Sequence, residues 1–300
     1  MALGTIFDRD RGFHVHGIPS KVSGLLYFYH MATISGLFIY PIKSLGGIEL
    51  ESAYLTDRGF QYDRRWMLID STGRFLTQRE HPVMALLQVT LKQDGLRVYH
   101  KKNTEISIRI PFEQQQGGET TVTVWEDTMP ATLVGAEFDN WFSQQLGMNC
   151  RLVYMPDYSR REVDPDYAHN KDLTSFSDAY PLLLIGQGSL NDLNSRLTEP
   201  VPMNRFRPNI VVEGWAPYEE DSIREFNIGE IQFEAVKPCA RCVLTTINQD
   251  TAEQGKDPLK TLAAYRSKNN KVLFGQNLLY NGNGYLKKPI EVHFLRNSNR

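Results

Sequence analysis

The stretch LLQVTLKQDGLRV at residues 86–98 predicts a β-hairpin and points to a β-rich fold. Apolar residues recur on both sides of the segment Gln93-Asp94-Gly95. An Asp-Gly pair supplies the positive φ that a tight hairpin turn needs. We therefore expect the two halves to pair as antiparallel strands. The apolar residues on which this rests are Leu86, Val89, Leu91, Leu96 and Val98.

Further short β-rich runs flank this hairpin and are separated by turn-forming residues. In the first half they cover residues 34–40, 48–56, 65–70, 74–78, 105–110 and 120–125. Such a series is typical of an antiparallel barrel or sandwich. No nucleotide-binding βαβ series is present. The second half predicts strands at 182–185, 210–212, 231–236, 243–247, 272–274 and 290–295.

Helices are few. Phe138, Trp141, Phe142 and Leu146 recur at helical spacing within 137–146, and Gly147 follows as a C-terminal cap. Two more helices are predicted, one capped by Ser189 and running to Leu197, the other spanning 258–265 with Asp257 as N-cap. A strand at 151–155 leads to a polar loop at 156–175, which is either the join between two lobes or a mobile cover over a site.

Length and composition suit two domains or one large β-rich unit. The net charge of -2 and pI near 6.4 give no global reason to expect nucleic-acid or membrane-surface binding, so small anionic ligands are the better expectation. Three cysteines are a poor basis for a disulfide framework and fit a reducing cytoplasm. We expect a cytoplasmic protein that binds neither nucleic acid nor membrane.

An uncharged run at residues 22–42 raises the alternative of a signal anchor. A membrane span needs about 20 predominantly apolar residues, whereas this run is interrupted by polar residues and by Pro41. We therefore expect residues 34–40 to begin the folded part as a strand. Residues 1–30 are then an N-terminal extension of unknown role, and Met31 is an alternative start of translation.

The segment KPCARCVLTT at 237–246 holds two of the three cysteines, spaced C-x-x-C. Nearby Lys237 and Arg241 favour a thiolate, the form that attacks or binds metals. A structural zinc site needs about four ligands, and a thioredoxin-type pair needs a following helix, whereas β-branched residues here predict a strand. Two interpretations are left. In the first, a single thiolate ligates the soft metal of a cofactor; in the second, the two cysteines are inert.

Three basic segments lie between predicted strands: YPIKS at 40–44, DRRW at 63–66 and NRFRPN at 204–209. Each alone is compatible with solvated surface charge. Arginine, however, matches phosphate oxygens bidentately, and charge-assisted hydrogen bonds contribute roughly 1.5–3 kcal/mol each. Several such residues converging on one phosphate would hold a ligand firmly.

Four segments together, IYPIKS at 39–44, FSDAYP at 176–181, RPN at 207–209 and CARC at 239–242, resemble the MOSC family. Their order and spacing resemble the two-part form found in mitochondrial amidoxime-reducing components and bacterial YcbX-type proteins, over about residues 33–297. The resemblance implies a mainly β protein with a few helices (α+β). It implies a MOSC N-terminal β-barrel domain at 31–155 and a MOSC β-barrel domain at 156–300.

The resemblance also implies a site. It implies a molybdenum cofactor in the molybdopterin form, with Cys242 as the molybdenum ligand. We expect Cys239 either to support that ligand from beside it or to be structural. Residues implied to contact the phosphate or pterin are Lys43, Ser44, Arg64 and Arg207, with Ser177, Asp178 and Asn209 close by. The implied activity is reduction of small N-hydroxylated compounds, in which two electrons cleave the N–O bond and water leaves. Asp178 is a candidate proton relay beside the catalytic Cys242.

One departure from the family pattern concerns electron supply. YcbX-type proteins carry a ferredoxin-like domain, and this sequence lacks the C-x(4)-C-x(2)-C spacing of a plant-type cluster. We therefore expect a separate electron-donor protein of flavin, ferredoxin or cytochrome type. The pyridoxal-phosphate domain of molybdenum-cofactor sulfurases is also missing, so sulfurase activity is not expected. The alternatives are a cofactor-binding, carrier or sulfur-transfer module without turnover, and a metal-free thiol-redox protein.

Overall fold

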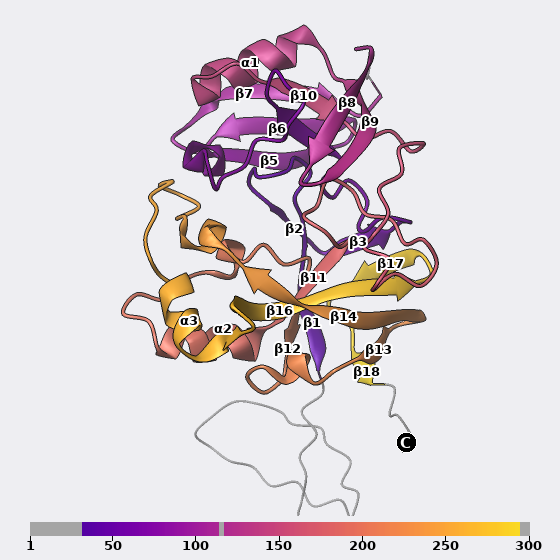
Figure 1. Ribbon diagram of the computed structural model, residues 1–300, viewed down its shortest axis with the longest axis vertical. Helices are drawn as coiled ribbons and strands as arrows, with labels where there is room; N and C mark the ends of the chain where they lie inside the picture. Colours follow the sequence, from indigo (N-terminus) through magenta and orange to yellow (C-terminus); the bar gives the residue numbers. More distant parts are fainter. Residues whose placement is uncertain (1–31, 114–116, 295–300) are drawn as a thin grey trace, which may run out of the picture. The chain divides into compact units, whose positions relative to one another are not determined.

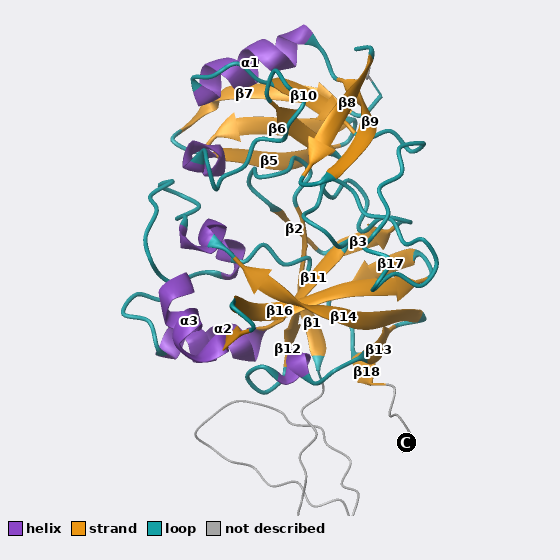
Figure 2. Cartoon of the chain, viewed as in Figure 1, coloured by secondary structure: helices purple, strands orange, loops and turns teal. Residues whose placement is uncertain are grey.

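A computed structural model describes residues 32–113 and 117–294, and it is built mainly of strands with a few helices (Figures 1 and 2). The predicted fold class is therefore confirmed. The N-terminal extension at 1–30 and Met31 lie outside the described residues. Within the described part, no helix is long and apolar enough to cross a membrane.

The largest sheet joins the start of the described chain to its second half. Its strand order is β18-β13-β14-β16-β11-β12-β1-β2, with β15 paired to β16. Only β11 and β12 pair in parallel; the other neighbours are antiparallel. The strands are β1 Thr33–Ile39, β2 Ile48–Leu50, β11 Leu182–Gly186, β12 Ile210–Glu213, β13 Glu225–Ile228, β14 Ile231–Arg241, β15 Ser267–Lys268, β16 Lys271–Asn281 and β18 Val292–Phe294.

Smaller sheets come from the sequence between β2 and β11, with one strand added from the segment after β16. A four-stranded sheet has the order β4-β10-β9-β8, a three-stranded sheet β5-β6-β7, and β3 pairs with β17. These strands are β3 Ser52–Leu55, β4 Trp66–Ile69, β5 Leu87–Lys92, β6 Gly95–His100, β7 Asn103–Pro111, β8 Glu119–Val124, β9 Asp127–Leu133, β10 Arg151–Tyr154 and β17 Gly284–Lys287. Trp66, Val89, Val98 and Phe142 belong to one core cluster, which packs β4, β5 and β6 against helix α1 (Ala136–Leu146).

The helices follow the predictions closely, but the two predicted N-caps, Ser189 and Asp257, are wrong, because Gly186 and Pro258 occupy the N-cap positions. The helices are α1 Ala136–Leu146, α2 Gln187–Ser195 and α3 Leu259–Arg266, and the 3₁₀ turns are η1 Pro82–Leu86, η2 Met203–Arg205, η3 Glu219–Asp221 and η4 Val243–Thr246. Gly147 caps α1 with φ 67° as expected. Ser189, the predicted cap of α2, instead lies inside the helix, because its hydroxyl donates to Glu220 Oε2 at 2.8 Å.

The hairpin of β5 and β6 is confirmed, but the glycine acts for a different reason. Lys92 pairs with Gly95, and neither turn residue, Gln93 or Asp94, is among the described residues with positive φ. A Cβ on Gly95 would lie 2.3 Å from the carbonyl oxygen of Ile110. Glycine is required because β7 approaches closely at this position.

Two predicted strands are wrong. Residues 74–78 form only isolated bridges, Ile69 with Phe75 and Arg74 with Thr123. Residues 243–247 form the 3₁₀ turn η4, because the hydroxyls of Thr245 and Thr246 donate to the carbonyl oxygens three residues earlier, at 3.0 and 2.7 Å. β-Branched residues favour strands in general, but here these local hydrogen bonds prevail. Cys242 thus follows the end of β14 in extended backbone rather than joining two strands.

Candidate functional site: a positively charged cavity containing Cys242

The residues implied by the family resemblance come together around one cavity. They come from distant segments: the turn after β1, the loop before β11, the segment after η2, and the end of β14. The cavity is lined by Lys43, Ser44, Arg64, Ser177, Asp178, Arg207, Asn209, Cys239 and Cys242, by Arg241, which the sequence indicated only as a charge favouring a thiolate, and by Arg79, which no sequence pattern indicated. The structure thus brings every predicted site residue to one place; their roles stay predictions.

Positive charge dominates this cavity. Among the described residues that line it, five side chains are cationic and Asp178 is the single carboxylate. Buried charges without counter-charges are costly, so an excess of this size suits an anionic ligand. The cationic side chains are Lys43, Arg64, Arg79, Arg207 and Arg241.

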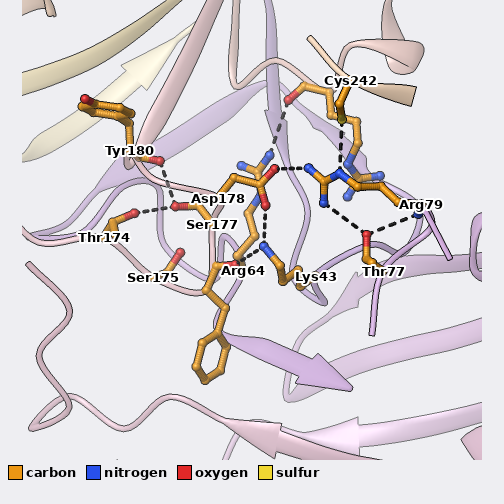
Figure 3. A network of polar contacts seen from close by, with 12 residues as sticks. Lys43, Arg64, Thr77, Arg79, Thr174, Ser175, Ser177, Asp178, Tyr180 and Cys242 are labelled. Atoms are coloured by element: carbon orange, nitrogen blue, oxygen red, sulfur yellow. Dashed lines mark hydrogen bonds and ion pairs between the residues drawn. The ribbon is translucent and has the colours of Figure 1, made fainter. Parts of the chain in front are cut away.

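A continuous chain of polar contacts links the thiol to the buried lysine (Figure 3). Arg79 donates from Nε to Cys242 Sγ at 3.1 Å and from Nη2 to Asp178 Oδ2 at 2.7 Å. Lys43 Nζ donates to the other Asp178 oxygen at 2.7 Å and to the Phe176 carbonyl oxygen at 2.8 Å. A guanidinium that donates to sulfur stabilises the thiolate form. The sequence prediction of Cys242 as a metal ligand is compatible with this arrangement.

The segment that carries Asp178 is fixed from behind by Arg161, in the polar loop. The Arg161 side chain is only 3% exposed and donates to the carbonyl oxygens of Ser175, Ser177 and Asp178, at 3.0, 2.5 and 3.0 Å. It also pairs with Asp127 of β9 at 2.8 Å. The loop at 156–175 thus anchors one wall of the cavity.

Burial and ion pairing shift the pKa values of Lys43 and Asp178 in opposite directions. Burial lowers the pKa of Lys43 to about 8, although Asp178 opposes the shift. For Asp178, burial favours the neutral form, but Lys43 and Arg79 outweigh it and hold its pKa well below the usual range. Its side chain is 54% exposed, so solvent screens part of this attraction. At neutral pH Asp178 is therefore ionised and Lys43 is protonated. Lys43 loses its proton as the pH rises through about 8.

This pKa predicts a pH-dependent affinity for anions. Sulfate keeps a constant charge from neutral to alkaline pH, so its binding to cofactor-free protein reports the charge of the protein. Affinity should fall about tenfold as the pH rises through about 8, because Lys43 loses its proton. Isothermal titration between pH 7 and 9.5 measures this change.

Lys43→Met is the matched control for this experiment. The variant should bind sulfate weakly at every pH, with the affinity that the wild type reaches only at the alkaline end. Equal wild-type affinities at pH 7 and 9.5 would contradict the role given to Lys43.

A second cluster places two guanidinium groups on one tyrosine ring. The Cζ atoms of Arg64 and Arg207 lie 4.4 and 4.1 Å from the centroid of the Tyr40 ring. Arg207 is 8% exposed and donates to the Leu45 carbonyl oxygen at 2.7 Å, while Arg64 pairs with Asp63. Burial lowers the pKa of Arg207 to about 10. Because burial disfavours its charged form, the Arg207 guanidinium is stabilised when an anion binds beside it.

Three of these residues have an unusual backbone. Ser44, Arg64 and Arg207 all lie in the left-handed region, with φ of 69°, 50° and 55°. Such conformations are disfavoured for residues other than glycine, and they gather where function demands them. Their coincidence in one cavity favours a binding site over a purely structural cluster.

Asn209 and Ser177 lie in the cavity wall with their polar groups already engaged. Asn209 donates to Asp63 Oδ2 and Phe38 O at 3.0 and 3.1 Å, and its oxygen accepts from Arg64 at 3.0 Å. Ser177 donates to the Tyr180 carbonyl oxygen at 2.8 Å. Both side chains therefore hold the wall together, and Asn209 also sets the position of Arg64.

The two cysteines have different neighbours. Cys242 accepts from Arg79, whereas Cys239 accepts from Arg241 Nη1 at 3.0 Å. Arg241 Nη2 donates to the Phe206 carbonyl oxygen at 2.6 Å, while its Nε is buried without a hydrogen-bond partner. An anion bound in the cavity would supply a hydrogen-bond acceptor for this unpaired N–H group. No local motif surrounds Arg79, and its partner Cys242 is 163 residues away in the sequence. The sequence alone therefore did not indicate a role for Arg79.

Comparison with known proteins shows which domain families the chain matches. Residues 31–149 match the MOSC N-terminal beta barrel domain and residues 171–292 match the MOSC domain. The chain belongs to the MOSC family. The relatives it resembles are amidoxime-reducing components and molybdenum cofactor sulfurases, so a function connected with the molybdenum cofactor follows.

Two relatives match most of their own length. Mitochondrial amidoxime-reducing component 1 of Mus musculus is 34% identical over 259 residues, 79% of this chain and 72% of the relative. Its Homo sapiens counterpart is 31% identical over 277 residues, 86% of this chain and 80% of the relative. The molybdenum cofactor sulfurase of Oryza sativa subsp. japonica is 31% identical over 82% of this chain but only 32% of its own length.

The residues of this MOSC chain fit the cofactor. The cavity offers a cysteine sulfur for a soft metal, buried cations for phosphate, and an unpaired Arg241 Nε. No group of three or more His, Cys, Asp or Glu in the described residues could hold a metal ion without further ligands.

Proposed function

We propose that the chain is a molybdenum-cofactor-dependent oxidoreductase that reduces small N-hydroxylated compounds, with electrons from a separate donor protein. The observation that supports this most directly is the juxtaposition of Cys242 Sγ and the Arg79 guanidinium in a cavity with an excess of buried cations. The amidoxime-reducing relatives support the choice of reaction. Cytoplasmic location and the domain boundaries near residue 155 remain parts of the proposal.

The reaction balances with two electrons and two protons. For an amidoxime the N–O bond breaks, the nitrogen side leaves as an amidine, and the oxygen leaves as water. The cofactor, when bound, supplies the two-electron redox couple. The protein must therefore hold the cofactor, orient the N–OH group and deliver protons.

Each of these tasks has a residue in the cavity. Cys242 would hold the metal, and Arg79, which donates to its sulfur, would orient it. Lys43, Arg64 and Arg207 hold the anionic part of the cofactor, with Ser44 beside them. Asp178 is ionised and carries no proton of its own to give. In a proton relay it can therefore act only as an acceptor, and its nearest donor is the ammonium group of Lys43 at 2.7 Å.

Metal and pterin analysis of protein from a molybdenum-replete host that makes the cofactor tests this proposal. We expect about one molybdenum and one pterin per chain, and amidine production from an amidoxime with a chemical electron donor. Protein without molybdenum would refute the proposal. Molybdenum without amidine would indicate a carrier, and a Cys239–Cys242 disulfide after mild oxidation, seen by mass spectrometry, would indicate a thiol-redox protein.

A further inference from the structure

Two buried glutamines from distant parts of the chain bond to each other. Gln78 lies in the segment that matches the MOSC N-terminal beta barrel domain and Gln249 in the segment that matches the MOSC domain, and they are 0% and 4% exposed. Gln249 Nε2 donates to Gln78 Oε1 at 3.0 Å, and Gln78 Nε2 donates to Gln249 Oε1 at 3.3 Å. A buried amide is costly unless it is hydrogen-bonded, so each glutamine depends on the other.

The same two amides also bind the backbone next to residues of the cavity. Gln78 Nε2 donates to the Ser44 carbonyl oxygen at 2.6 Å, and Gln249 Nε2 donates to the Ile247 carbonyl oxygen at 3.1 Å. Ser44 lines the cavity in a left-handed conformation. Ile247 follows the turn η4, which begins directly after Cys242. The pair therefore links the turn that carries Ser44 to the segment that follows Cys242.

Gln78 also lies between two residues of the polar network in Figure 3. Its chain neighbours are Thr77 and Arg79. Arg79 donates from Nη1 to Thr77 Oγ1 at 3.2 Å and from Nε to Cys242 Sγ at 3.1 Å. Residues 74–78 form isolated bridges and no regular strand, so a strand ladder does not fix them. The side-chain hydrogen bonds of Gln78 therefore help to fix the position from which Arg79 reaches Cys242.

Burial and pairing alone would also suit a purely structural role. This pair, however, joins three segments that each carry a residue of the cavity, namely Ser44, Arg79 and Cys242. Lys101 holds the pair in turn, since its Nζ donates to the Gln249 carbonyl oxygen at 2.5 Å. The location of the pair therefore favours a role in arranging the site.

We propose that Gln78 and Gln249 are positioning residues, which hold the walls of the cavity so that Arg79 reaches the Cys242 sulfur before any cofactor is bound. Neither glutamine is among the described residues that line the cavity, so both act through the residues that they hold. The purpose of the pair rests on the proposed function, in which Cys242 binds the metal. The arrangement itself can be measured on cofactor-free protein.

Solvent exchange of the Arg79 Nε–H proton, followed by NMR in cofactor-free protein, tests the positioning directly. The signal is assigned by its loss in Arg79→Met, and Cys242→Ala gives the exchange rate without the hydrogen bond to sulfur. Gln78→Met keeps the side-chain length but loses the amide, so exchange should become about tenfold faster and approach the rate in Cys242→Ala. Adding Gln78→Met to Cys242→Ala should change the rate no further, because both act on the same hydrogen bond.

Ser189→Ala is the matched control for lost stability. It removes a buried hydrogen bond to Glu220, and Ser189 is not among the described residues that line the cavity. Its melting temperature should fall about as far as that of Gln78→Met, with wild-type exchange at Arg79. Equal acceleration of exchange in Ser189→Ala and Gln78→Met would overturn the proposal, because general loosening would then explain both.

Gln249→Met is the second test of the pair, since it keeps the bond from Gln78 to Ser44. Exchange at Arg79 should become about threefold faster, and a wild-type rate in either glutamine variant would overturn the proposal. Protein without molybdenum would refute the proposed function and leave these exchange rates unaffected. Loaded, active wild-type protein with an unchanged exchange rate in Gln78→Met would overturn the positioning alone.

Discussion

Cys242→Ser should purify with less than about a tenth of the wild-type molybdenum content and without amidoxime reductase activity. A serine hydroxyl does not ionise near neutral pH, so Arg79 would face a neutral oxygen and the soft metal would lose its thiolate. Molybdenum per chain by mass spectrometry of the metal and amidine production by chromatography measure the two losses. The melting temperature of the cofactor-free variant should match that of the wild type.

Cys239→Ser is the matched control, since it makes the same chemical change in the wall of the same cavity. Cys239 accepts from Arg241 and not from Arg79. A serine oxygen can accept that hydrogen bond equally well, so most of the molybdenum should remain. The reverse pattern, with the metal lost from Cys239→Ser and kept by Cys242→Ser, would exchange the roles of the two sulfurs.

Arg207→Met should abolish cofactor retention while leaving the stability of the cofactor-free protein close to that of the wild type, because relief from the buried charge offsets the loss of the hydrogen bond to the Leu45 carbonyl oxygen. Arg207 is buried on the Tyr40 ring, and burial lowers its pKa to about 10. Methionine fills a similar volume without the cost of a buried charge. Urea denaturation of the cofactor-free proteins measures stability, and pterin fluorescence after release measures retention.

Arg205→Met supplies the comparison. Arg205 is equally buried, but it donates to the Thr245 and Asp257 carbonyl oxygens at 2.8 and 3.3 Å, and it does not line the cavity. Its loss leaves carbonyl groups unpaired, so this variant should be less stable by about 1–3 kcal/mol and retain its pterin. A wild-type pterin content in Arg207→Met, or a larger loss of stability in Arg207→Met than in Arg205→Met, would contradict the proposal that Arg207 holds the cofactor.

Local patterns predicted much of the fold because they depend on neighbours in the chain. The helix α1 and its cap at Gly147 follow from apolar spacing and from the conformational freedom of glycine. The β5–β6 hairpin was also predictable, although Gly95 serves the approach of Ile110 rather than the turn. The turn η4 was not predictable from propensity, since Thr245 and Thr246 are strand formers whose hydroxyls bond locally here.

The candidate site divides in the same way. Its motifs, from Lys43 to Cys242, could be recognised in the amino-acid order, and their membership of one cavity could be expected from family resemblance. Which cysteine faces which arginine, the ionisation of Asp178 between Lys43 and Arg79, and the pairing of Gln78 with Gln249 had no signal in the sequence. These features arise from contacts between residues far apart in the chain, and only the folded packing specifies their distances, burial and charge.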